Sequence, residues 1–128
     1  KNTFAIDIQN YKTEENYISN NNYAHGFYGP IINNWEGYLH YMVRQGYIGF
    51  TATEEDIIFL TYEEPDLSLF TESEIETMKL VKNKLKGKSA AELTKWSHNF
   101  KGWKDTKNGE IIDPKKYAKY FSLDDGWE

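Results

Sequence analysis

The sequence contains no cysteine among its 128 residues. Disulfide bonds, zinc sites built on cysteine and thiol catalysis are therefore all excluded, and the composition fits a reducing compartment. No apolar run approaches the ~20 residues that a membrane-spanning helix needs. We therefore expect a cytoplasmic protein with no membrane partner.

Positive charge is also scarce. The 15 Lys and Arg residues face 20 Asp and Glu residues, which gives a formal net charge of -5 and a pI near 5.2. Because affinity for nucleic acids depends largely on Lys and Arg neutralising phosphates, the composition argues against a nucleic-acid partner. An acidic chain of this kind is better matched to a protein partner with a basic surface.

The sequence also lacks the motifs of common catalytic sites. Its nine glycines are scattered and form no phosphate-binding loop, and no G-x-S-x-G nucleophile turn is present. The three histidines, His25, His40 and His98, do not have the close spacing of a helical metal pair. We therefore predict no catalytic set, no metal site and no cofactor.

The most informative stretch is residues 28–48, YGPIINNWEGYLHYMVRQGYI. Gly29-Pro30 is a turn signal, because glycine reaches backbone angles that other residues avoid and proline fixes φ. A helix with one apolar face follows, with Asn33 or Asn34 as its cap. Gly46 is expected to end this helix, and the next residues begin a strand.

The remaining pattern predicts a mainly α fold with a small antiparallel β-hairpin, an α+β class, in one domain over residues 1–128. The hairpin is expected within residues 47–63. Two capping boxes, Thr71 with Glu74 and Ser89 with Glu92, predict further helices, and Asp113-Pro114 predicts a last one. Residues 1–13 fit a strand and a helix equally well, and the tail at residues 124–126 is expected to fray.

Two ionisable residues stand out from the rest. Asp7 lies within an apolar segment, where a charge is costly unless it is paired, so we expect a buried structural acid. His98 closes a predicted helix just before Trp103. It is either a catalytic base or, by the reading we favour, a histidine that bonds a backbone group or caps the helix.

Several short motifs complete the sequence evidence. In chain order they are Tyr28-Gly29-Pro30, Asn34-Trp35, Leu39, Gly46-Tyr47-Ile48, Ser89-Ala90-Ala91-Glu92-Leu93, Ser97-His98, Trp103-Lys104 and Gly109-Glu110-Ile111-Ile112. Together they resemble the signature of the SocA-like antitoxin domain, also called the Panacea domain. Asp7 stands where that family tends to carry an aspartate on its first helix, which favours a helix for residues 1–13. This helix is expected to be truncated relative to the family.

The resemblance implies a mainly helical fold and a role as an antitoxin that neutralises a partner toxin by direct binding, with no enzymatic reaction. The alternatives are a phage-encoded inhibitor of a host defence protein and a small enzyme that uses His98 as a base. Aromatic residues in predicted loops, with His98 beside them, are the candidates for partner binding, although each aromatic fits the core equally well. These aromatics are Tyr23, Tyr28, Phe100 and Trp103. Trp35 and Trp96 lie on helix faces and are expected in the core.

Overall fold

The computed structural model describes all 128 residues, and their contacts divide the chain into two units. The first unit comprises Lys1–Asn33 together with Phe70–Glu128, and the second comprises Asn34–Leu69. Helices predominate and the strands form small antiparallel sheets, which confirms the predicted α+β class. A single domain over residues 1–128 stays a prediction, and each unit is described by itself.

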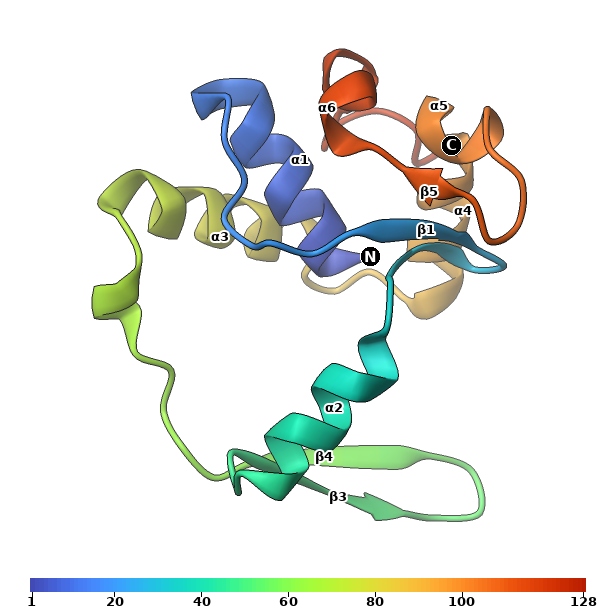
Figure 1. Ribbon diagram of the computed structural model, residues 1–128. Helices are drawn as coiled ribbons and strands as arrows, with labels where there is room; N and C mark the ends of the chain where they lie inside the picture. Colours follow the sequence, from blue (N-terminus) through green and yellow to red (C-terminus); the bar gives the residue numbers. More distant parts are fainter. The chain divides into compact units, whose positions relative to one another are not determined.

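The first unit begins with a helix, α1 (Asn2–Glu14), as the resemblance predicted. Phe4 and Ile8 lie one turn apart on its buried face, so the helical reading of this ambiguous segment is the right one. The helix packs against α3 (Glu72–Leu85) and α6 (Pro114–Tyr117), as Figure 1 shows. Its truncation relative to the family stays a prediction.

A three-stranded antiparallel sheet, which the sequence pattern did not predict, lies in the same unit. It is formed by β1 (Tyr23–Gly26), β2 (Gly29–Ile32) and β5 (Ile111–Ile112), with β1 in the middle (Figure 1). The register pairs Tyr23 with both Ile32 and Ile112. The sheet therefore joins segments that are almost 90 positions apart in the sequence.

The expected turn at Gly29-Pro30 is wrong by two residues, because the chain reverses at Phe27-Tyr28 and Gly29 and Pro30 already belong to β2. Gly29 nevertheless needs to be glycine: its φ is 124°, and a Cβ there would lie 2.3 Å from the Ser97 hydroxyl oxygen. Pro30 is tolerated because β2 is an edge strand, where a missing N–H is least costly.

Both predicted capping boxes are formed. Thr71 opens α3, and Ser89 opens α4 (Ala90–Asn99), each exchanging bonds with a glutamate three residues on. A short helix, α5 (Lys101–Lys104), and a 3-10 turn, η2 (Ala118–Tyr120), complete the unit. Asp113 caps α6 with Pro114 in its first turn, as predicted.

The core of the first unit is built from α1, β1, α3, α4, β5 and the chain around α6. The Phe4 ring meets Tyr23 edge-on, with a centroid distance of 5.0 Å and an interplanar angle of 81°. Trp96 is buried, as predicted. The buried hydrophobic residues of the core cluster are Phe4, Ala5, Ile8, Tyr23, Val81, Leu85, Trp96, Ile112, Tyr117, Ala118, Phe121 and Leu123.

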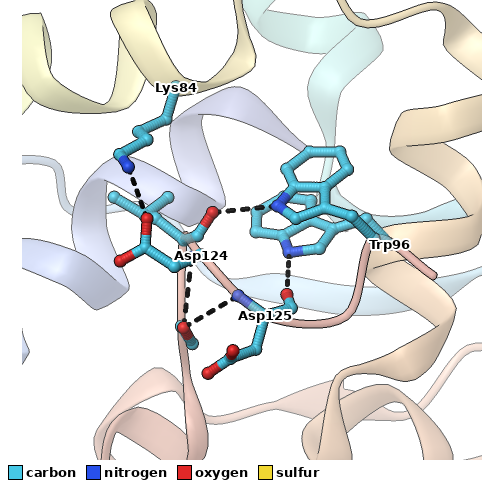
Figure 2. A network of polar contacts seen from close by, with 7 residues as sticks. Lys84, Trp96, Asp124 and Asp125 are labelled. Carbon is cyan, nitrogen blue, oxygen red and sulfur yellow. Dashed lines mark hydrogen bonds and ion pairs between the residues drawn. The ribbon is translucent and has the colours of Figure 1, made fainter.

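The C-terminal tail is not frayed, so that expectation is wrong. Trp127 stacks on Trp96 with a centroid distance of 4.9 Å and an interplanar angle of 3°. The Trp96 indole N–H donates to the Asp125 carbonyl oxygen at 3.1 Å, and Lys84 pairs with Asp124 (Figure 2). The tail is ordered because the Trp127 ring packs on Trp96 of α4 and because the Trp96 indole N–H bonds the tail backbone.

The second unit contains α2 (Trp35–Arg44), β3 (Ile48–Ala52), β4 (Ile57–Thr61) and a 3-10 turn, η1 (Leu67–Leu69). The two strands form the predicted antiparallel hairpin. Gly46 lies just after the helix with a φ of 77°, as a helix end with left-handed backbone requires.

Two expectations for α2 are wrong. Asn34 occupies the cap position, but its side chain makes no capping bond, because its backbone is left-handed (φ 62°) and not extended. Trp35 is 47% exposed, and no residue of α2 is buried. One helix and one two-stranded hairpin provide too little surface to enclose the apolar face of the helix.

Candidate functional site

The turn between β1 and β2 carries two adjacent exposed aromatic residues, Phe27 and Tyr28, which we call the hairpin tip. Phe27 is 77% exposed and Tyr28 is 64% exposed. Their rings meet edge-on, with a centroid distance of 4.9 Å and an interplanar angle of 83°. Large rings with few internal rotamers lose little entropy when they bind, so the hairpin tip is well suited to contact a partner.

The hairpin tip is held by three aromatic rings behind it, His25, His98 and Trp103, which we call the ring stack. Trp103 is stacked with His98 at a centroid distance of 3.8 Å and with His25 at 4.3 Å. The Trp103 indole N–H donates to the Gly26 carbonyl oxygen at 2.9 Å. The ring stack therefore packs and hydrogen-bonds the β1–β2 turn against α4 and α5.

His98 also bonds the hairpin tip directly, because its Nε2 lies 2.9 Å from the Phe27 carbonyl oxygen. A carbonyl oxygen only accepts, so the bond requires a proton on Nε2. His25 is held in turn by Thr106, whose hydroxyl oxygen lies 2.9 Å from His25 Nδ1. Both histidines thus have structural partners, which is the reading of His98 that we favoured from the sequence.

A shallow open groove adjoins the hairpin tip along α4. Its lining residues are Tyr28, Ala90, Ala91, Thr94, Lys95, His98 and Asn99. Lys95 is its charged residue, and no carboxylate lines it. The alternative in which His98 acts as a base with an acid beside it is therefore not supported by this geometry.

Three of the five residues predicted to bind a partner come together here, namely Tyr28, His98 and Trp103. The other two do not. Tyr23 is only 1% exposed, so the expectation of an exposed side chain is wrong, because this residue lies in the central strand β1. Phe100 is half-buried and packs edge-on against Phe4 with a centroid distance of 5.5 Å.

Sequence reasoning missed Phe27, the most exposed large hydrophobic side chain of the chain. The available signal was weak: glycines stand on both sides of the Phe27-Tyr28 pair, but hairpin turns favour Asn, Asp or Gly at the turn positions themselves. The misplaced turn at Gly29-Pro30 concealed it, because Phe27 then lay outside the expected turn.

The residues predicted as structural have mixed outcomes. Asp7 is buried, and its carboxylate accepts bonds from the Ile18 and Ser19 backbone N–H groups at 3.0 and 2.9 Å, as expected of a structural acid. Gly29 and Pro30 are buried in β2. Gly46 ends α2, whereas Trp35 lies at the surface.

No group of three or more His, Asp and Glu side chains is placed to hold a metal ion. None of the helices combines the length and the apolar character that crossing a membrane requires.

Fold and site together define a small α+β protein with an aromatic hairpin tip supported by two hydrogen-bonded histidines. The model of the family described as "Antitoxin SocA-like, Panacea domain" matches residues 1–104, and the chain belongs to this family. The match includes the whole of α1 and ends before Gly109–Ile112, which had also been part of the resemblance. Comparison with curated proteins and with solved structures gave no match. Membership supports a role of the toxin–antitoxin type.

Proposed function

We propose that this protein is an antitoxin that neutralises a partner toxin by binding it directly, and that the hairpin tip is part of the contact. Family membership is the observation that supports the role. The two exposed rings of Phe27 and Tyr28 support the location. Aromatic residues dominate the binding energy of many protein interfaces.

Neutralisation works by occupancy: the antitoxin covers the working surface of the toxin or holds it in an inactive shape. A stable interface buries roughly 1,600 Å² in total and takes about 20–30 residues from each partner. The hairpin tip alone is smaller than this, so further surface of the chain takes part. The net charge of -5 favours a toxin with a basic surface and speeds the encounter more than it deepens affinity.

Co-expression with the product of the neighbouring gene tests the proposal. The full chain is expected to restore growth that this product inhibits and to co-purify with it in a defined stoichiometry. Growth that stays inhibited, together with the absence of a complex between the purified proteins, would refute the proposed function.

The location is tested by the double variant Phe27→Ser/Tyr28→Ser. Both side chains are largely in solvent, so the fold is retained, while the affinity for the toxin falls by at least about tenfold. Leu80→Ser is the matched control, because Leu80 is an exposed apolar residue on α3 of the same unit. Equal affinities of the two variants and the parent chain would place the interface elsewhere.

A further inference from the structure

The β3–β4 hairpin is apolar on both of its faces. Phe50 and Phe59 are directly opposite each other across the strands, with a ring centroid distance of 6.3 Å, and Ile57 lies two residues from Phe59 on the same face. Ile58 and Leu60 project from the other face. All five side chains are exposed, and Phe59 retains 54% of its accessible surface.

Tyr62 extends the second face. Its ring lies over Gly49, where an added Cβ would come within 2.4 Å of the Tyr62 hydroxyl oxygen. Tyr62 itself is exposed. Isolated two-stranded hairpins are marginally stable, and soluble monomers seldom leave large contiguous apolar patches uncovered. This hairpin therefore has the composition of a surface that another molecule covers.

The charge of the chain is concentrated in the same unit. Seven of the 20 acidic residues but only one of the 15 basic residues lie within Asn34–Leu69, which gives this unit a formal net charge of -6 and the rest of the chain +1. The acidic residues are Glu36, Glu54, Glu55, Asp56, Glu63, Glu64 and Asp66, and the basic residue is Arg44. The acidity of the whole protein is thus a property of the second unit.

Four of the acidic residues lie at the two ends of the β3–β4 hairpin. Glu54, Glu55 and Asp56 form the turn between β3 and β4, and Glu63 follows β4 at the other end. The turn is fixed, because the Thr53 hydroxyl accepts a bond from the Asp56 backbone N–H at 2.9 Å. Carboxylates therefore flank both ends of an apolar centre, which is the usual layout of a protein interface, with an apolar core and a polar rim.

We propose that the exposed faces of the β3–β4 hairpin bind a protein whose surface is apolar at its centre and basic around it. The inference rests on the proposed function, in which that protein is the toxin. A second copy of this chain is a poor occupant of this surface. The Asn34–Leu69 units of the two copies would each carry a charge of -6 and would repel each other. A toxin surface with an apolar centre complements the apolar strands of the hairpin, and basic residues around that centre complement the carboxylates at its ends.

The first test uses charge reversal in the full chain, with the purified product of the neighbouring gene as the probe. Glu54→Lys/Glu63→Lys is expected to lower the association rate constant by roughly tenfold at low salt, and by less at high salt because ions screen the charges. Glu14→Lys/Glu76→Lys changes the net charge equally at exposed positions of the first unit and is the matched control. Equal rate constants for both double variants would overturn the assignment to the hairpin.

The second test does not depend on a substitution. Hydroxyl-radical footprinting of the parent chain is expected to label Phe50 and Phe59 when the chain is free and to protect them in the complex. Protection in the free chain that is independent of concentration would mean that the chain covers these rings itself, and concentration-dependent protection would mean that a second copy does. Either result, or labelling that is unchanged by the probe, would overturn the inference.

Failure of this inference differs from failure of the proposed function. If the parent chain neutralises the neighbouring product while the Glu54→Lys/Glu63→Lys variant associates as fast as the parent, the antitoxin role stands and the hairpin is not its surface. If the parent chain itself neither rescues growth nor forms a complex, both are wrong.

Discussion

The hydroxyl of Tyr23 donates a hydrogen bond of 2.5 Å to the buried carboxylate of Asp7. This bond joins the central strand β1 to α1. The Ser19 hydroxyl donates to the same carboxylate, so one acid organises the loop that leads from the helix to the strand. Because β1 ends in the hairpin tip, the interior of the first unit and its candidate binding surface share one element.

Substitution of Asp7 tests this network. Asp7→Ala leaves two backbone N–H groups and two hydroxyls without their acceptor, so the free energy of unfolding is expected to fall by about 3 kcal/mol. Asp124→Ala is the control, because it removes only an exposed ion pair, worth less than about 1 kcal/mol. Urea denaturation measures both, and similar midpoints for the two variants would contradict the structural role of Asp7.

Alkaline pH provides a second prediction. Burial raises the pKa of Tyr23 above the ordinary tyrosine value of 10.0, and the bond to Asp7 raises it further. Above pH 10.0 the unfolded chain therefore loses this proton while the folded chain keeps it, so the stability from this group is complete below that pH and declines as the pH rises.

Tyr23→Phe is expected to lower the free energy of unfolding at pH 8 by about 1 kcal/mol and to make its decline between about pH 9 and 11 shallower. Tyr41→Phe removes a hydroxyl from an exposed ring and is the control. Urea midpoints across this pH range provide the measurement. A decline as steep in Tyr23→Phe as in the parent chain would show that other groups cause it.

Gly29 provides a test of backbone geometry. Gly29→Ala is expected to lower the free energy of unfolding by at least about 3 kcal/mol, because the left-handed backbone is unfavourable for alanine and the new Cβ meets the Ser97 hydroxyl. Gly109→Ala carries the backbone cost alone, about 1 kcal/mol, since no atom lies within 4 Å of the added Cβ. Equal losses would mean that the contact with Ser97 relaxes without cost.

Trp127 tests the order of the tail. Its ring stacks on Trp96 and its indole N–H donates to the Leu123 carbonyl oxygen at 2.9 Å. Trp127→Ala is therefore expected to lower the free energy of unfolding by about 2 kcal/mol. Lys84→Ala, which removes the exposed ion pair nearby, is expected to cost under about 1 kcal/mol. A thermal midpoint of Trp127→Ala equal to that of the parent chain would show that the tail is frayed and adds no stability.

Trp103 tests how the hairpin tip is held. Trp103→Phe keeps an aromatic ring in the ring stack but removes the indole donor to Gly26, so backbone amides at residues 26–29 are expected to exchange faster with solvent. Hydrogen exchange measures this directly, with the amides of α3 as an internal control. Unchanged exchange at the hairpin tip would show that stacking alone holds it.

Part of this structure could be predicted from the sequence because the signals are local. A capping box joins residues three positions apart, so Thr71 and Ser89 mark their helices without any knowledge of the fold. The β3–β4 hairpin is similar, since its strands are adjacent in the chain. The buried acid Asp7 was predictable because an isolated charge among apolar residues needs partners.

The remaining features depend on contacts between distant segments. The central position of β1 comes from pairing with β5, so the sequence could not distinguish the buried Tyr23 from the exposed Tyr28 five residues later. The stacking of His25 on Trp103 likewise joins two residues that are far apart in the sequence, so no local pattern indicates it.

The sequence by itself determined the helix starts at Thr71, Ser89 and Asp113, the acidic charge and the family, because each depends on residue identity and short spacing. Only the tertiary structure decided which aromatic residues face solvent. The exposure of a side chain depends on which residues pack against it. In this protein those residues are often distant in the sequence.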